Sequence, residues 1–294
     1  MNERVLDEPP ATWPMLLRAA LPVVPGANRL PGIRRSATEL PDLRLVRHEV
    51  PVERAHVDAY AEVCAFPRRD TVPLTYPHVL AFAMHLALMT DRTFPYPAVG
   101  TVHLENSITR HHPVRVGDRL SVTVWAGGLR SHPKGHLFDL HTEISVGDKL
   151  AWEETSTMLR RGAGDPAAPE SEHGLVDIPA GATRWRLGAG LGRRYASVSG
   201  DHNPIHLYKW SAKAFGFPRQ IAHGMWTQAR CLAALEGRLP DRVRVDVAFK
   251  KPVLLPGTVS FGSRREADGY AFSLRDAHAE APHLLGRLID STDG

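Results

Sequence analysis

The sequence predicts an α+β protein made of two similar halves, each with an antiparallel sheet. Three observations support this fold class. The same order of sequence motifs occurs twice, once on either side of a polar, proline-containing break near the middle of the chain. Within each half, strand-like runs follow a buried helix instead of alternating with helices, which is typical of antiparallel α+β domains. The 294 residues also give room for two modest domains.

Composition and charge exclude several other classes of protein. Hydrophobic residues make up 43% and charged residues 23%, as in folded soluble proteins. The net charge of +4 accompanies arginines that are scattered along the chain, so we expect no nucleic acid partner. No apolar run is long enough to span a membrane and no signal-peptide pattern is found, so we expect no membrane partner and a cytoplasmic location. Cys64 and Cys231 are isolated, which predicts buried thiols without a disulfide or a thiolate zinc site.

Two segments of distinct composition set the expected domain boundaries. Residues 1–45 are rich in proline and have no sustained period, so we expect an irregular arm. Residues 162–180 begin with a small, polar, proline-bearing stretch that is typical of a linker. The predicted domains are therefore residues 1–161, which include the arm, and residues 181–294.

The internal repeat is carried by three matched segments. They begin in the first half at Tyr60, His78 and Pro113, and in the second half at Tyr195, His223 and Pro252. The offsets between the matched residues are 135, 145 and 139, so the second half is ten residues longer between the tyrosine and the histidine. This extra length coincides with the segment SGDHNPIHL, residues 199–207. Ala65 and Phe66 stand in the first half where Gly200 and Asp201 would lie.

Each half is expected to contain a helix, then a second apolar helix, then four strands. The first helix contains Tyr60 or Tyr195, and the second begins near His78 or His223 and is expected to be buried. In the second half the strand-like runs are residues 243–249, 258–263, 270–276 and 283–290.

The segment SGDHNPIHL has the features of a rigid acid/base site. Gly200 permits a tight backbone turn, Asn203 can bond within its own turn, and Pro204 fixes its φ angle. A carboxylate and an imidazole five residues apart, Asp201 and His206, can move protons at neutral pH. The alternative is a capped loop with a solvated histidine. The repeat favours the acid/base site, because a capped loop alone would not require ten additional residues in only one of the two halves.

The residues Tyr195–His206, followed by Ala222–Met225, resemble the hydratase 2 motif of MaoC-like (R)-specific enoyl-thioester hydratases and dehydratases. The resemblance covers about residues 45–294, and its specific part covers about residues 195–226. It implies the hotdog fold, an antiparallel sheet wrapped around a long helix. The repeat resembles the double-hotdog members, which include single-chain mycobacterial-type 3-hydroxyacyl-thioester dehydratases. The expected architecture is thus two antiparallel sheets, each wrapped around a long central helix.

The resemblance also implies an activity in fatty acid metabolism: reversible syn addition of water to a trans-2-enoyl thioester, which gives the (3R)-hydroxyacyl thioester. Asp201 and His206 match the catalytic pair that holds one water, and which of them handles which proton stays open. Gly224 matches the backbone amide that stabilises the thioester carbonyl, although tight helix packing is the alternative. No cofactor is expected, because the substrate itself carries coenzyme A or the phosphopantetheine of an acyl carrier protein.

The first half lacks the dyad, so we expect a single active site. Small and flexible side chains of its apolar helix are predicted to line an acyl-chain channel: Ala83, Met84 and Ala87. Lys250 and Lys251 are either phosphate contacts or an exposed strand end. A homodimer of double-hotdog chains is a further expectation. His223 and His78 are both interpreted as structural residues.

Other chemistries fit less well. Asp201, His206 and His223 are three candidate metal ligands, but no helical HxxxH or paired carboxylate supports them, so no metal is expected. The glycines of residues 188–192 resemble a dinucleotide loop without its third glycine or a βαβ context. Ser199 does not lie in the G-x-S-x-G motif of serine hydrolases. Two alternative functions stay open: a hotdog acyl thioesterase and an acyl-thioester-binding subunit without turnover.

Overall fold

The computed structural model describes residues 2–12, 14–16, 38–170 and 173–291. Its strands form one eleven-stranded sheet in the order β1-β2-β4-β5-β6-β3-β8-β11-β10-β9-β7. The strands are β1 (Asn2–Val5), β2 (Leu43–Pro51), β3 (Thr101–Arg110), β4 (Arg119–His132), β5 (Gly135–Val146), β6 (Lys149–Arg161), β7 (Thr183–Leu187), β8 (Val243–Phe249), β9 (Gly257–Glu266), β10 (Gly269–Asp276) and β11 (Pro282–Asp290).

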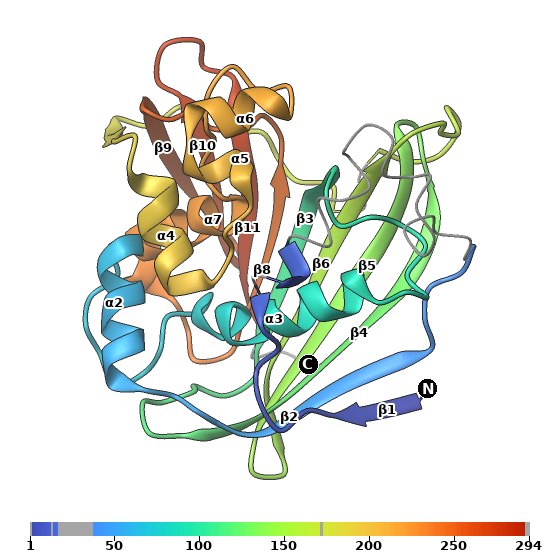
Figure 1. Ribbon diagram of the computed structural model, residues 1–294. Coiled ribbons are helices and arrows are strands. Elements are labelled where there is room, and N and C mark those ends of the chain that lie inside the picture. Colours follow the sequence, from blue (N-terminus) through green and yellow to red (C-terminus); the bar gives the residue numbers. More distant parts are fainter. Residues whose placement is uncertain (1, 13, 17–37, 171–172, 292–294) are drawn as a thin grey trace.

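The helices lie on one face of this sheet (Figure 1). They are α2 (Arg54–Cys64), α3 (Tyr76–Thr90), α4 (Leu191–Ser199), α5 (Pro204–Leu207), α6 (Lys209–Ala214) and α7 (Gly224–Leu235), and α7 continues into a 3₁₀ turn, Glu236–Arg238. Helix α3 crosses the strands of the first half, and α7 occupies the same place in the second half. The α+β double-hotdog fold is confirmed, and the two expected sheets are joined edge to edge through β3 and β8.

The junction of the two halves has approximate twofold symmetry. The strand order β2-β4-β5-β6-β3 is mirrored by β8-β11-β10-β9-β7. The offset of 139 residues that relates the strands of the two halves maps Ser107 onto Asp246, and these two residues face each other in the register of β3 and β8. The Ser107 hydroxyl donates a hydrogen bond of 2.7 Å to the Asp246 carboxylate. The pseudo-twofold axis therefore passes between these two residues.

The sequence missed one strand in each half. Strands β2 and β7 each precede the first helix of their half and add a fifth strand to the four that were expected. The segment Asn2–Val5 also forms a strand, parallel to β2, so the expectation of an irregular arm over residues 1–45 is wrong there. All four of its residues are exposed, which leaves no apolar alternation to detect. Residues 17–37 of the expected arm lie outside the described residues.

The structure corrects the alignment of the two halves around the second helix. Equivalent bridges join Thr71 to Arg115 and Ile221 to Leu254, so the offset before this helix is 150, not 145. The offset between the halves is 135 at the first helix and 150 just before the second. The second half is therefore 15 residues longer between these two points. The extra residues form α5 and α6. The pairing of His78 with His223 is therefore wrong: Gln228 is the counterpart of His78, and Pro73 is the counterpart of His223.

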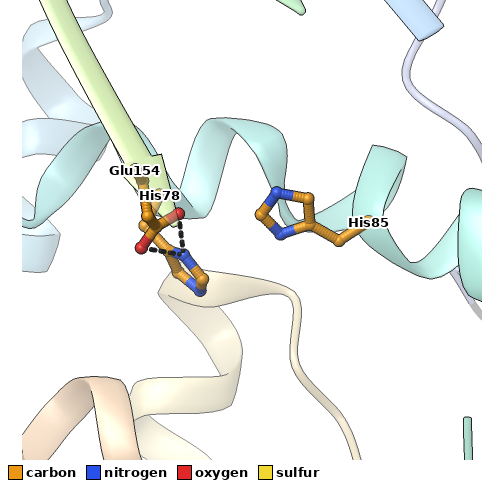
Figure 2. A group of neighbouring side chains, drawn as sticks. All are labelled: His78, His85 and Glu154. Atoms are coloured by element: carbon orange, nitrogen blue, oxygen red, sulfur yellow. Dashed lines mark hydrogen bonds and ion pairs between the residues drawn. The ribbon is translucent and has the colours of Figure 1, made fainter. Parts of the chain in front are cut away.

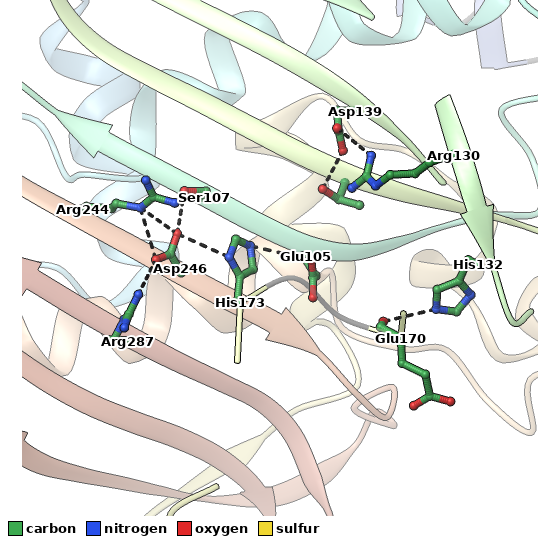
Figure 3. Close-up of polar contacts among 11 residues, drawn as sticks. Glu105, Ser107, Arg130, His132, Asp139, Glu170, His173, Arg244, Asp246 and Arg287 are labelled. Atoms are coloured by element: carbon green, nitrogen blue, oxygen red, sulfur yellow. Dashed lines mark hydrogen bonds and ion pairs between the residues drawn. The ribbon is translucent and has the colours of Figure 1, made fainter. Parts of the chain in front are cut away.

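The predicted linker is packed along the sheet. Between β6 and β7 its described residues form neither helix nor strand. His173 lies between the buried carboxylates of Glu105 and Asp246, with ring nitrogens 3.8 Å from each (Figure 3). Farther along, the carbonyl of Ile178 accepts a hydrogen bond of 2.8 Å from Arg275. The segment thus follows the sheet instead of forming a free tether.

The remaining sequence-based expectations concern cysteines and membranes. Cys64 and Cys231 are buried free thiols, as predicted. Among the described residues no helix has both the length and the apolar character needed to cross a bilayer.

Candidate active site

The loop that carries Asp201 is shaped by the ends of two helices. Gly200 ends α4 with a φ of 76°, a left-handed conformation that favours glycine. Pro204 is the first residue of α5, and the Asn203 side chain caps this helix by accepting a bond of 3.4 Å from the amide of Ile205. The Asn203 amide in turn donates to the Asp201 carboxylate over 3.1 Å. The polar side chains of the motif therefore hold the loop in one conformation.

The side chains of Asp201 and His206 lie close to each other. A carboxylate oxygen of Asp201 and a ring nitrogen of His206 lie within 4.8 Å of each other, a gap that one water can bridge. Nδ1 of His206 donates to the carbonyl of Ile221 over 2.9 Å. This bond places the imidazole proton on Nδ1 and leaves Nε2 as an acceptor in the neutral ring. The side chain of Asp201 keeps 24% exposure, while His206 is buried.

The environment keeps both groups able to accept a proton at neutral pH. Burial alone would raise the pKa of Asp201, but His223, His206 and the bond from the Asn203 amide together hold it below the ordinary value. Burial lowers the pKa of His206, and the Asp201 carboxylate opposes this only in part. At pH 7 the site thus holds a carboxylate beside a neutral imidazole.

His223 is part of the site, although the sequence indicated only a structural role for it. Its ring stacks on that of His206 with 3.7 Å between centroids and 25° between planes. Its Nε2 donates to the Asp201 carbonyl over 3.0 Å and lies 3.7 Å from the Asp201 carboxylate. Burial lowers the pKa of His223 to about 3, so the ring stays neutral. His223 thus holds both members of the dyad from one side.

Gly224 follows His223 as the first residue of α7. Its amide is one of the first four of the helix and has no partner within it. A Cβ at this position would lie 3.2 Å from the ring of Phe249, so glycine also permits close packing of α7 on β8. The position of Gly224 is therefore compatible with both interpretations of this residue. Its amide lies at a helix N-terminus next to His223, as a donor to the thioester carbonyl would, and its lack of a side chain permits close packing of the helix.

The first half packs directly against the catalytic loop. Nε2 of His56 in α2 donates to the carbonyl of Val198 over 2.8 Å, one residue before α4 ends. In α3, Cδ1 of Phe82 lies 3.7 Å from the position that a Cβ of Gly200 would occupy. Residues of the first half therefore border the loop that carries Asp201.

The predicted acyl-chain channel coincides with neither of two cavities in the described part of the chain. Met84 is fully buried in the hydrophobic core, and Ala87 packs against that core. One cavity, of about 300 Å³, is lined mostly by polar residues of the first half together with His173 and Arg244, and the other, of about 500 Å³, lies between β7, β9 and α7. Ala83, Met84 and Ala87 line neither of them. The channel stays a prediction.

Two sets of side chains have metal-ligand composition. Asp201, His206 and His223 offer three ligand atoms within 4.8 Å of one another, so the metal alternative considered from the sequence keeps its ligands in reach. A second set, His78, His85 and Glu154, lies in the first half and was not foreseen (Figure 2). In both sets hydrogen bonds to protein groups already occupy ring nitrogens.

Comparison with known proteins extends over both halves. Residues 191–275, which include Asp201, His206 and Gly224, match the family described as MaoC like domain. Residues 51–131 match the family described as FAS1-like, dehydratase domain region. Over 280 residues the chain is 42% identical to 3-hydroxyacyl-thioester dehydratase X of Mycobacterium tuberculosis, covering 93% of this chain and 96% of that protein. The chain belongs to the family of MaoC-like dehydratases. Members of this family are hydro-lyases.

Solved structures of MaoC-like dehydratases have the same architecture. The crystal structure of HtdX from Mycobacterium tuberculosis, 41% identical, superposes with a TM-score of 0.74 and covers 83% of this chain and 98% of that chain. A MaoC-like dehydratase from Phytophthora capsici is 18% identical, with a TM-score of 0.71 over 87% of this chain and 96% of that chain, and shares the fold. The double-hotdog arrangement is thus common to distant members of the family.

Lys250 and Lys251 lie directly after β8, where both are exposed. Their backbone amides donate to the carbonyls of His283 and Pro282 at the start of β11, over 2.9 and 3.2 Å. They form a strand end, as one of the two interpretations holds. They also follow Phe249, whose ring packs on Gly224. Their contact with phosphate stays a prediction.

Proposed function

We propose that the chain catalyses the reversible, (R)-specific hydration of trans-2-enoyl thioesters and the dehydration of (3R)-hydroxyacyl thioesters. The observation that carries this proposal is the pair of acceptors, the Asp201 carboxylate and Nε2 of His206, on either side of a gap that fits one water. The name of the M. tuberculosis relative supports an acyl-thioester substrate.

The resting state of the dyad explains how one water can react. Because Asp201 is ionised and Nε2 of His206 is unprotonated, a water between them donates one hydrogen to each. Its oxygen lone pair is then free to bond to C3 of the enoyl thioester. One dyad member takes a proton from this water, the C2–C3 π electrons move towards the carbonyl as an enolate, and C2 receives the proton. Both groups act from one face of the substrate, so the addition is syn.

The enolate needs stabilisation at the thioester oxygen. We assign this role to the amide of Gly224 at the N-terminus of α7, where the helix dipole also favours negative charge. The substrate brings its own coenzyme A or phosphopantetheine, so the reaction requires no resident cofactor. Lys250 and Lys251 are candidate contacts for the phosphates of that carrier.

An assay with crotonyl-coenzyme A tests the proposal against both alternatives. A hydratase removes the absorbance of the enoyl thioester and releases no free thiol. A thioesterase releases stoichiometric thiol, which a thiol reagent detects. A binding subunit changes neither signal while it still shows saturable binding of the thioester. Thiol release or binding without turnover would each overturn the proposed reaction.

A further inference from the structure

The cavity of about 500 Å³ between β7, β9 and α7 opens at the edge of the sheet that lies farthest from β1. Its volume is within the range of about 300–1,000 Å³ that is common for small-molecule sites. Aromatic rings, small residues and two arginines line it, and no described acidic residue does. Asp201, His206 and His223 are not among the lining residues, so the cavity is separate from the candidate active site.

Two stacked rings form the apolar wall of this cavity. Trp185 of β7 stacks on Phe261 of β9, with 5.2 Å between ring centroids and 17° between planes. Phe261 belongs to the hydrophobic core, and Trp185 packs against that core. Arg230 of α7 places the central carbon of its guanidinium 3.8 Å from the centroid of the Trp185 ring. An apolar surface and a cation therefore lie next to each other in the cavity.

The two arginines are not balanced by a neighbouring carboxylate. Arg230 is partly buried, and Arg238, in the 3₁₀ turn after α7, lies 5.5 Å from the ring centroid of Tyr270. Within the described residues, neither guanidinium forms an ion pair or a hydrogen bond. Burial lowers the pKa of Arg230, and the groups that oppose this effect are the thiols of Cys231 and Cys64. An aromatic ring offsets part of the cost of a partly buried cation, and an anion would offset the rest.

The first half has no such opening, because core side chains fill the same place. The offset of 150 residues at the second helix relates Ala234 to Met84 and Arg230 to Leu80. Met84 is fully buried, and Leu80 packs against the core. Ala234 is exposed and lines the cavity. An alanine and an arginine thus keep open in the second half a space that two apolar side chains close in the first.

The charge of this edge favours a small anion over a second copy of the chain. Arg184 and Arg186 flank Trp185 on β7 and are both exposed. Antiparallel pairing of two β7 strands about Trp185 would place Arg184 opposite Arg186, and like charges in direct opposition are destabilising. The same positive charges raise the local concentration of anions.

We propose that this cavity binds an amphipathic organic anion, with its acidic head on Arg230 and Arg238 and its apolar body against Trp185 and Phe261. A carboxylate or phosphate head accepts charge-assisted hydrogen bonds from the guanidinium groups. An alkyl body removes the exposed part of the rings from water. This binding site goes beyond the proposed hydratase reaction, and its test measures binding instead of turnover.

The test follows the indole N–H signal of Trp185 by NMR while four probes are titrated: octanoate, octyl phosphate, octanol and inorganic phosphate. The chain has six tryptophans, so the signal is assigned by its loss in Trp185→Phe. Octanol has the apolar body without a charge, and inorganic phosphate has the charge without an apolar body. The signal reports from the cavity itself, so binding elsewhere on the protein is not counted.

Three variants locate the binding site. Arg230→Met removes one charge from the cavity and keeps a long side chain. Ala234→Met introduces the residue that the first half has at the corresponding position, so it should fill the cavity without removing a charge. Arg186→Met is the matched control, because alternate side chains of a strand point to opposite faces and Arg186 does not line the cavity. Thermal melting establishes that each variant is folded.

Octanoate or octyl phosphate is expected to shift the signal saturably and to bind at least about tenfold more tightly than octanol and inorganic phosphate, because charge-assisted bonds and apolar contact act together. The tighter of the two identifies the head group. Arg230→Met should weaken this binding about tenfold or more, Ala234→Met should abolish it, and Arg186→Met should leave it unchanged.

Three results would overturn the inference. The first is the absence of a saturable shift with both anionic probes. The second is equal affinity for octanol or for inorganic phosphate, since the site would then recognise only an apolar body or only a charge. The third is unchanged affinity in a folded Arg230→Met or Ala234→Met variant.

Discussion

At the residue scale, the proton transfer proposed for Asp201 and His206 depends on contacts that fix the orientation of both side chains. Nδ1 of His206 is hydrogen-bonded to a backbone carbonyl, so Nε2 is the nitrogen left for the role that we propose. His223 holds the ring of His206 by stacking and the Asp201 backbone by a hydrogen bond. Each of these contacts fixes orientation, and none of them supplies a nucleophile.

Replacement of either dyad member is expected to abolish most of the activity while the fold persists. Asp201→Asn and His206→Gln should each lower kcat/KM by about 10²–10⁴-fold, because one proton-transfer group is lost. Steady-state kinetics with an enoyl thioester measures this, and thermal melting serves as the control for folding. Rates close to wild type in either folded variant would refute the role of the dyad.

The acid limb of the pH profile is expected below pH 6.5. Both pKa values are lowered: that of His206 by burial, and that of Asp201 because His223 and His206 outweigh the effect of burial. As the pH falls from 7, both groups therefore stay unprotonated past the ordinary imidazole value of about 6.5, and activity is retained. Measurements of kcat/KM made immediately after a pH jump separate this limb from unfolding. Half-loss of activity at pH 6.5 or above contradicts the account.

The sequence predicted the residues of the dyad but not their neighbours. Asp201 and His206 lie within six residues of one short motif, so the sequence alone was enough to nominate them. His223 contacts Asp201 and His206 only because α7 packs beside their loop, and its supposed counterpart His78 lies in α3 of the other half. Their aligned positions at the start of apolar helices indicated a false equivalence, because sequence order does not show where the insertion ends.

At the element scale, the packing of α4 on α5 positions His206. A methyl group on Gly192 of α4 would overlap the backbone carbonyl oxygen of His206. Gly192→Ala should therefore displace α5, destabilise the protein by about 1–3 kcal/mol and lower kcat/KM at least tenfold. Gly188→Ala is the matched control, since nothing lies within 4 Å of a Cβ built there. Equal stability and activity of the two variants would show that this contact does not hold the site.

Elements with an internal pattern could be predicted, and edge strands could not. The alternating segment Val243–Phe249 forms β8, and the other three strand-like runs of the second half form β9, β10 and β11. The two second helices begin within two residues of their expected starts. In contrast, β1 and β7 lie at the two sheet edges with mostly exposed side chains, so their pairing depends on neighbours that local sequence does not reveal.

At the scale of the whole molecule, buried neutral histidines make stability depend on pH. Burial lowers the pKa of His223 and of His85 to about 3, and that of His103 to about 4. In the unfolded chain these rings titrate near 6.5, so below that pH the unfolded state binds protons that the folded state excludes. The free energy of unfolding is therefore expected to fall between pH 6.5 and pH 4.

Each such histidine contributes up to about 1.4 kcal/mol per pH unit, so three of them make the decline steep. Urea unfolding at pH 7, 6 and 5 measures this dependence. An unchanged free energy of unfolding across the series would mean that these rings are protonated without cost, and that the polar interior is accessible to water.

The two halves are joined into one sheet by the pairing of β3 with β8, which local sequence patterns do not reveal. The repeat in the sequence predicted two related domains, yet it did not predict that β3 and β8 pair around Ser107 and Asp246. The same union brings α3 of the first half against the catalytic loop of the second. The loop that carries the motif therefore packs against the half that lacks it.

Hydration of a trans-2-enoyl thioester in heavy water, followed by NMR of the product, tests the central claim most directly. Addition through one water held by Asp201 and His206 predicts a (3R)-hydroxyacyl thioester with one deuterium at C2, placed syn to the new hydroxyl. The Asp201→Asn variant should form this product far more slowly. A (3S) product, anti addition, or free acid and thiol in place of the hydroxyacyl thioester would contradict the account.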